Sequence, residues 1–149
     1  MPQPPPQPPD AASVSFPHDR ARIEALVNDI LAGMARRGYT ESSRFAVRLA
    51  LEEALSNAFH HGHKGLPEET PIRVDYRIAD DQLEVTIEDQ GPGFNPASVP
   101  DPTLDENLEL PSGRGLVLIR AYMTEVQYLG RGNRLRLVYT RPPAKGAAG

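Results

Sequence analysis

The sequence contains no cysteine and no tryptophan, and it has no long apolar segment. The absence of cysteine excludes disulfides and thiolate chemistry, and it is consistent with a protein of the reducing cytoplasm. No apolar run approaches the roughly 20 residues that span a bilayer, and the proline-rich start does not resemble a signal peptide. The net charge is −4 and there is no basic run, so we expect no direct binding of nucleic acid or of an anionic membrane surface.

The 149 residues are enough for one globular domain with its own core. Residues 1–12 are mostly proline and glutamine, which predicts a disordered tail because such a segment has little apolar surface to bury. Residues 142–149 consist mainly of proline, alanine and glycine and predict a flexible tail. We therefore expect a single folded domain over residues 13–141.

Hydrophobic periodicity predicts both helices and strands in this domain. The expected elements, in chain order, are an edge strand at 13–16, a helix at 20–37, a second helix from Thr40 or Ser42 to Gly62, a hairpin at 72–78 and 83–88, a helix at 116–123, and a closing hairpin at 126–129 and 134–140. Asp19 is suited to cap the first helix, and Gly38 is suited to a left-handed residue after it. Three phenylalanines are most simply core residues: Phe45, Phe59 and Phe94.

The second predicted helix carries a polar face in its C-terminal half. Glu53, Asn57, His60 and His61 recur at helical spacing, away from a stripe of apolar residues. This face brings a carboxylate, an amide and two imidazoles together. A solvated face of an ordinary amphipathic helix has the same pattern, so this stretch alone does not decide between a functional site and a surface.

An acidic residue and alternating glycines follow the first predicted hairpin, in the stretch Asp89-Gln90-Gly91-Pro92-Gly93. A carboxylate at the end of a buried strand can accept a hydrogen bond from an amino group of a ligand. The glycines would let the backbone approach that ligand closely. A tight turn after a strand uses the same residue types, and this alternative stays open.

A second glycine motif, Gly113-Arg114-Gly115, precedes the third predicted helix. Backbone N–H groups at a helix N-terminus bind anions such as phosphate, and Arg114 adds a charged donor. The motif does not follow a strand, and Leu118 occupies the third glycine position of a Rossmann fingerprint, so dinucleotide binding of that type is not supported. A flexible entry into a helix is the simpler alternative.

In this order, the three stretches resemble the N box, G1 box and G2 box of the GHKL ATP-binding superfamily, which includes histidine-kinase ATPase domains, gyrase-type ATPases and MutL-type proteins. The form of the first box, residues 53–58 followed by His61 and Gly62, is most similar to the anti-sigma-factor serine/threonine kinase branch. The resemblance covers roughly residues 14–141. It implies the histidine-kinase-like ATPase fold, which is an α/β fold of the α+β two-layer sandwich type. The implied sheet is mixed, mostly antiparallel and about five-stranded, with helices packed on one face.

The resemblance also implies roles for individual residues. Asn57 would coordinate Mg²⁺ through its amide oxygen, and Glu53 would be the general base that takes the proton from an incoming hydroxyl. Asp89 would accept a hydrogen bond from the exocyclic amine of adenine. The implied nucleotide-binding residues are Asn57, His61, Asp89, Gly91, Gly93, Phe94, Gly113, Arg114, Gly115 and Leu116. Residues 95–112 would form the ATP lid, and ATP and Mg²⁺ are the implied cofactors.

Some positions differ from the family pattern or compete with it. Val117 occupies the place of a further glycine of histidine kinases, as the anti-sigma branch often allows. Asn133 lies where many relatives have a threonine near the phosphates. Glu52 is a second carboxylate on the helix, but it is not four residues from Asn57. The histidines at 60, 61 and 63 could bind a transition metal, but no acid or cysteine stands near them in a ligand spacing, which favours a supporting or surface role.

The implied function is that of a serine/threonine kinase that acts as an anti-sigma factor in the cytoplasm. It would phosphorylate a STAS-domain anti-anti-sigma protein and sequester a sigma factor. The alternatives are a non-catalytic nucleotide-binding regulator of such partners and a stand-alone histidine-kinase-like ATPase module. A full sensor histidine kinase is disfavoured, because the sequence shows no sensor segment and little room for a phosphoacceptor hairpin before the N box. A homodimer stays open, since relatives often dimerise but the sequence shows no dimer seam.

Overall fold

The computed structural model describes residues 10–63, 65–91, 119–130 and 132–142. The elements in these ranges, in chain order, are β1 (Asp10–Phe16), α1 (Arg20–Arg36), α2 (Glu41–Asn57), the π-helical turn η1 (Ala58–Gly62), β2 (Ile72–Ile78), β3 (Gln82–Glu88), β4 (Glu125–Leu129) and β5 (Arg134–Thr140). Residues 119–122, within the third predicted helix, are also helical. No helix in the described ranges combines the length and the apolar character needed to cross a membrane.

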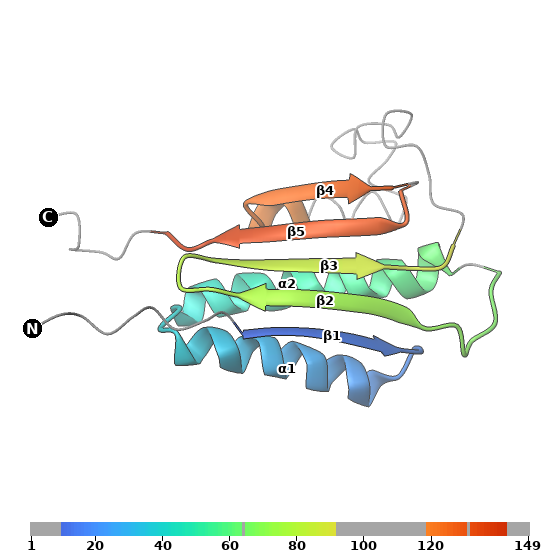
Figure 1. Cartoon of the computed structure of the whole chain (residues 1–149), viewed down its shortest axis with the longest axis horizontal. Coiled ribbons are helices and arrows are strands. Elements are labelled where there is room, and N and C mark those ends of the chain that lie inside the picture. The colour runs from blue at the N-terminus through green and yellow to red at the C-terminus, as the bar shows by residue number, and fades with distance from the viewer. Residues whose placement is uncertain (1–9, 64, 92–118, 131, 143–149) are drawn as a thin grey trace, which may run out of the picture.

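The five strands form one sheet in the order β1-β2-β3-β5-β4. All the pairings between these described strands are antiparallel. Helices α1 and α2 lie next to each other on one face of the sheet (Figure 1). This is the two-layer α/β architecture predicted from the sequence, and both predicted hairpins are present.

The core lies between the sheet and the helices. On β2 and β3, apolar residues alternate with polar ones, and the apolar side chains are at most 2% exposed. These strand residues are Ile72, Val74, Ile78, Leu83, Val85 and Ile87. They pack with the predicted stripes of both helices, which include Ile30, Met34, Val47, Leu51 and Leu55. The alternation therefore fixes which face of the sheet the helices cover.

Local signals define the ends of the two helices. Asp19 caps α1, because its Oδ1 accepts a hydrogen bond from the backbone N–H of Ala21 at 2.9 Å. Thr40 caps α2, because its Oγ1 accepts from the backbone N–H of Ser43 at 3.1 Å. Gly38 lies between the helices with φ of 82°, a conformation that a β-carbon would strain. These caps confirm the predicted boundaries and select Thr40 over Ser42.

Strand β1 begins earlier than the sequence predicts. The predicted tail extended to residue 12, but Asp10, Ala11 and Ala12 pair with the end of β2. The Asp10 carboxylate also forms ion pairs with Arg36 and Arg37, at 3.6 and 3.5 Å. The proline-rich composition ends at Pro9, and the next three residues gain backbone hydrogen bonds from β2 that composition alone does not reveal. Residues 1–9 lie outside the described residues.

Phe45 was predicted to be a core residue, and this prediction is wrong. Its side chain is 59% exposed. The buried face of α2 includes Ser43 and Val47, and Phe45 is two residues from each. Two residues correspond to about 200° around a helix, so Phe45 points away from the sheet. Phe59 is buried as predicted.

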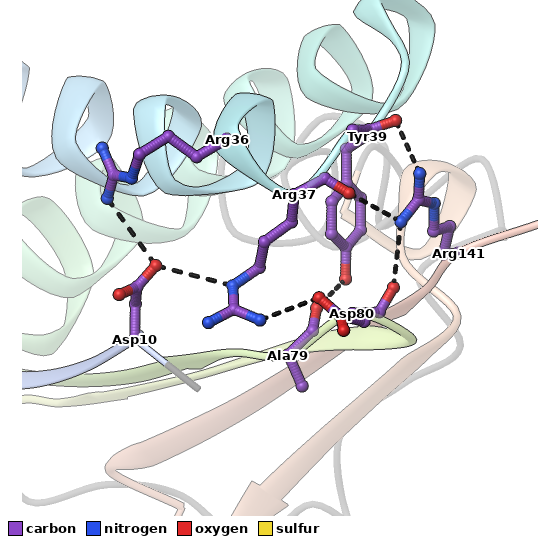
Figure 2. A network of polar contacts seen from close by, with 8 residues as sticks. Asp10, Arg36, Arg37, Tyr39, Ala79, Asp80 and Arg141 are labelled. Atoms are coloured by element: carbon purple, nitrogen blue, oxygen red, sulfur yellow. Dashed lines mark hydrogen bonds and ion pairs between the residues drawn. The ribbon is translucent and has the colours of Figure 1, made fainter. Parts of the chain in front are cut away.

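A polar network holds the end of the molecule that carries the α1–α2 loop and the β2–β3 turn (Figure 2). The Tyr39 hydroxyl donates to the carbonyl of Ala79 at 2.7 Å, and the Arg37 guanidinium pairs with Asp80 at 2.8 Å. Arg141, just after β5, donates to the backbone carbonyls of Arg37 and Asp80, and it stacks over the Tyr39 ring at 4.8 Å. The network therefore joins the helices to the sheet at the end opposite the C-terminus of α2.

Candidate functional site

The C-terminal end of α2 carries the two residues predicted for catalysis and metal binding. Glu53 and Asn57 are four residues apart on this helix, so their side chains lie on the same face. Both are half-buried, whereas the neighbouring Glu52 is exposed. A carboxylate and an amide oxygen one turn apart are oxygen donors of the kind that Mg²⁺ prefers.

The helix does not stop at Asn57 but widens into the π-helical turn η1. The backbone N–H of His63 donates to the carbonyl of Ala58 at 3.1 Å, which is the five-residue spacing of a π turn. Such turns are rare and frequently occur at functional sites. The sequence predicted a helix over this segment, and the wider turn was missed because residues 58–62 also suit an α-helix.

The stretch that begins at Asp89 is a tight turn with an acidic side chain at its start. The Asp89 carboxylate accepts a hydrogen bond from the backbone N–H of Gly91 at 2.8 Å. Its backbone exchanges two hydrogen bonds with Asn133: the Asp89 N–H donates to the Asn133 carbonyl, and the Asn133 side-chain amide donates to the Asp89 carbonyl, both at 2.9 Å. The turn is therefore fixed against the start of β5, and Asn133 is a site residue whose contact the sequence did not predict.

The end of α2 and the Asp89 turn are in direct contact through two glycines. An added β-carbon on Gly62 would overlap the carboxyl group of Asp89. An added β-carbon on Gly91 would overlap the carbonyl oxygen of Gly62. Both positions thus need glycine because the two segments approach so closely. This contact brings the first two predicted boxes, far apart in the sequence, into one site.

A buried histidine lies beneath this contact. His63 is 7% exposed, and its Nε2 accepts a hydrogen bond from the backbone N–H of Gln90 at 3.0 Å. Its ring meets the ring of Phe59 edge-on, with centroids 5.9 Å apart. The sequence favoured a supporting or surface role for His63, and its burial excludes the surface alternative.

The sequence model of the histidine kinase-like ATPase domain matches residues 16–139. The chain belongs to the histidine kinase-like ATPase domain family. Its relatives include serine-protein kinase RsbW of Listeria innocua, which is 32% identical over 104 residues, covering 65% of this chain and 66% of the relative. Serine-protein kinase RsbW of Bacillus licheniformis is 31% identical over 111 residues, or 68% of this chain and 67% of the relative. The chain thus spans about two thirds of the length of these relatives.

A solved structure supports the same fold for this histidine kinase-like ATPase domain. It contains the RsbU and RsbW domains of a Mycobacterium tuberculosis protein. The likeness covers 91% of this chain and 34% of that chain, with a TM-score of 0.59 and 16% sequence identity. The family resemblance and the fold inferred from the three boxes are therefore confirmed.

Four of the predicted site residues are fully described in the structure of this ATPase domain: Glu53, Asn57, Asp89 and Gly91. The side chain of His61 lies outside the described part of the structure. Gly93, Phe94, the lid at 95–112, Gly113, Arg114, Gly115 and Leu116 also lie outside the described residues. Their roles stay predictions.

Two further histidines with described side chains, His18 and His60, are engaged in local packing. His60 is exposed and its Nδ1 lies 3.2 Å from the Ser56 hydroxyl. The His18 ring packs against Phe59 and His60, with centroids 4.9 and 5.5 Å apart. Among the described residues, no group of three or more histidine, cysteine or acidic side chains could hold a metal ion.

Tyr128 on β4 is a further residue that the sequence analysis did not single out. Burial raises its pKa to about 12, the Arg120 cation opposes this shift, and the Asp89 carboxylate adds to it. The tyrosine therefore stays neutral at physiological pH and lies within electrostatic range of Asp89. No sequence signal identifies it, because a tyrosine in a short edge strand is ordinary.

Proposed function

We propose that this domain is an ATP-dependent serine/threonine kinase that acts as an anti-sigma factor. It would phosphorylate a STAS-domain anti-anti-sigma protein and sequester a sigma factor, as a cytoplasmic protein. The names of the RsbW relatives support kinase activity at the level of the family. The observation that carries the proposal is the contact of Gly62 with Asp89 and Gly91, at the end of the helix that carries Glu53 and Asn57.

Each described residue has a specific task in this proposal. Asp89 accepts from the adenine amine, while its bond to the Gly91 N–H keeps the carboxylate oriented. Asn57 supplies an amide oxygen to Mg²⁺, whose charge offsets that of the phosphates when it is bound. Glu53 is placed one helical turn before Asn57, and its carboxylate accepts the proton of the attacking hydroxyl.

In the transfer step, one bond to the γ-phosphorus forms and one breaks. The hydroxyl oxygen of the substrate serine or threonine bonds to the γ-phosphorus of ATP as its proton passes to Glu53. The bond from the γ-phosphorus to the bridging oxygen breaks, and ADP leaves. The products are ADP and a phosphorylated side chain on the partner. The protein's contribution is mainly positioning, together with one base.

The proposal is tested by incubating the purified chain with Mg²⁺, ATP labelled at the γ-phosphate, and the cognate STAS-domain protein. We expect label on a serine or threonine of the partner, and capture of the sigma factor by this chain in a pull-down. Nucleotide binding without transfer to a verified partner would instead identify a non-catalytic regulator. Release of labelled phosphate without a labelled partner would identify a stand-alone ATPase module.

A further inference from the structure

His63 connects the end of α2 to the Asp89 turn by a hydrogen bond of defined direction. The backbone N–H of Gln90 can only donate, so Nε2 of His63 must be the acceptor and carry no proton. In the neutral imidazole, the single ring proton is then on Nδ1. The ring is buried and packs edge-on against Phe59, which limits its rotation.

The Asp89 turn is held from three sides. Asn133 fixes the backbone of Asp89 from the start of β5, and the Gln90 side chain donates to the carbonyl of Pro71, just before β2, at 3.0 Å. The His63 bond fixes the middle of the turn from the end of α2. Since η1 sets the position of His63 through the bond to Ala58, the turn is located relative to the helix of Glu53 and Asn57.

We propose that His63 is a positioning residue that holds Asp89 for recognition of the adenine base. This inference rests on the proposed nucleotide-binding function and deepens it. At the 6-position adenine carries an amino group and guanine a carbonyl oxygen, so only adenine can donate to the Asp89 carboxylate from that position. A loosened turn therefore weakens selection of the base, whereas contacts to the phosphates are made elsewhere. His63 itself contacts the turn, and the role proposed for it needs no direct contact with the nucleotide.

The test compares three variants of the full chain by calorimetric titration with Mg·ATP and Mg·GTP. His63→Leu keeps an apolar side chain but has no acceptor, so the Gln90 N–H loses the hydrogen bond that His63 accepts. We expect a loss of ATP affinity of roughly tenfold with a smaller loss for GTP, which lowers the preference for ATP. His63→Gln supplies an amide oxygen as a substitute acceptor and should retain most of that preference. His60→Leu, at the exposed neighbouring histidine, is the matched control and should bind both nucleotides as the wild type does.

The outcomes separate the inference from the function on which it rests. If the wild type binds neither nucleotide, the proposed function fails and the inference fails with it. If the wild type binds nucleotide and His63→Leu keeps the same preference for ATP, the inference about His63 fails but the proposed function stands. Equal losses for ATP and GTP, accompanied by a lower unfolding temperature, would also overturn it, because they indicate a purely structural role.

If His63→Leu does not fold, His63→Asn replaces it, since its shorter amide places the acceptor out of reach. Equal ATP preference in His63→Asn and His63→Gln would then contradict the inference.

Discussion

At the scale of single residues, Asp89 forms a tight turn, and the proposed function also requires its carboxylate to accept from a ligand. One carboxylate oxygen accepts from the Gly91 N–H, and the backbone on both sides of Asp89 is tied to Asn133. A carboxylate held in this way needs no rearrangement to accept from an amine, which limits the entropic cost of binding. The same bond explains why a tight turn and a ligand site share a sequence pattern here: Asp89 forms the turn, and in the proposed function it also binds the ligand.

Asp89→Asn tests the ligand role without removing the turn. The asparagine side chain can still accept from the Gly91 N–H, because asparagine forms the same local turn. The charge is lost, so we expect ATP affinity to fall roughly tenfold to a hundredfold, as measured by calorimetry. Asp81→Asn, at an exposed acid in the β2–β3 turn, is the control and should bind ATP as the wild type does. Unchanged ATP affinity in Asp89→Asn would rule out its assigned role.

At the scale of elements, strong periodicity made most of the fold predictable. The apolar stripes of α1 and α2 and the alternation in β2 and β3 each bury one face, so that pattern alone identifies the element and its orientation. The start of β1 was missed because pairing with β2 supplies bonds that are not encoded locally. The prediction for Phe45 was wrong because it rested on the hydrophobic character of the residue and not on its position around the helix.

The candidate site was predictable only in part, because some of its contacts join segments that are distant in the sequence. The residue types of the N box and the G1 box indicated their chemistry, and α2 places Glu53 and Asn57 on one face as the spacing required. The contact of Gly62 with Gly91 and the bond of His63 to Gln90 join segments far apart in the chain. Such contacts depend on how the π turn meets the end of β3, and no local pattern records them.

The network around Arg37 predicts a difference between two adjacent arginines. The Arg37 side chain is 3% exposed and pairs with Asp80 at 2.8 Å, whereas that of Arg36 is 66% exposed and lies 3.6 Å from Asp10 (Figure 2). We expect Arg37→Met to lower the free energy of unfolding by about 1–3 kcal/mol, because the network loses a charged donor whose side chain is buried. Arg36→Met should change it by less than about 0.5 kcal/mol, as exposed pairs contribute little. Urea denaturation of both variants measures the difference, and equal values would refute a structural role for Arg37.

At the scale of the whole molecule, α2 links two ends with different tasks. Its 17 residues span about 25 Å, from Thr40 beside the polar network to Asn57 at the site. The polar network joins helices and sheet near the N-terminal end of α2, and Glu53 and Asn57 lie near its C-terminal end. Loss of the network should therefore lower stability without changing the affinity of the folded protein for ATP.

In the proposed function this ATPase domain transfers phosphate with Glu53 as its base, and a matched pair of variants tests that role most directly. Glu53 is half-buried on the face of Asn57, and the adjacent Glu52 is exposed. The measurement is the rate of phosphoryl transfer from Mg·ATP to the STAS-domain partner, with nucleotide affinity measured in parallel. We predict that Glu53→Gln lowers the rate by at least about a hundredfold while still binding ATP, and that Glu52→Gln transfers as the wild type does. A wild-type rate of phosphoryl transfer in Glu53→Gln, or a larger loss of rate in Glu52→Gln, would contradict the role of Glu53 as the base.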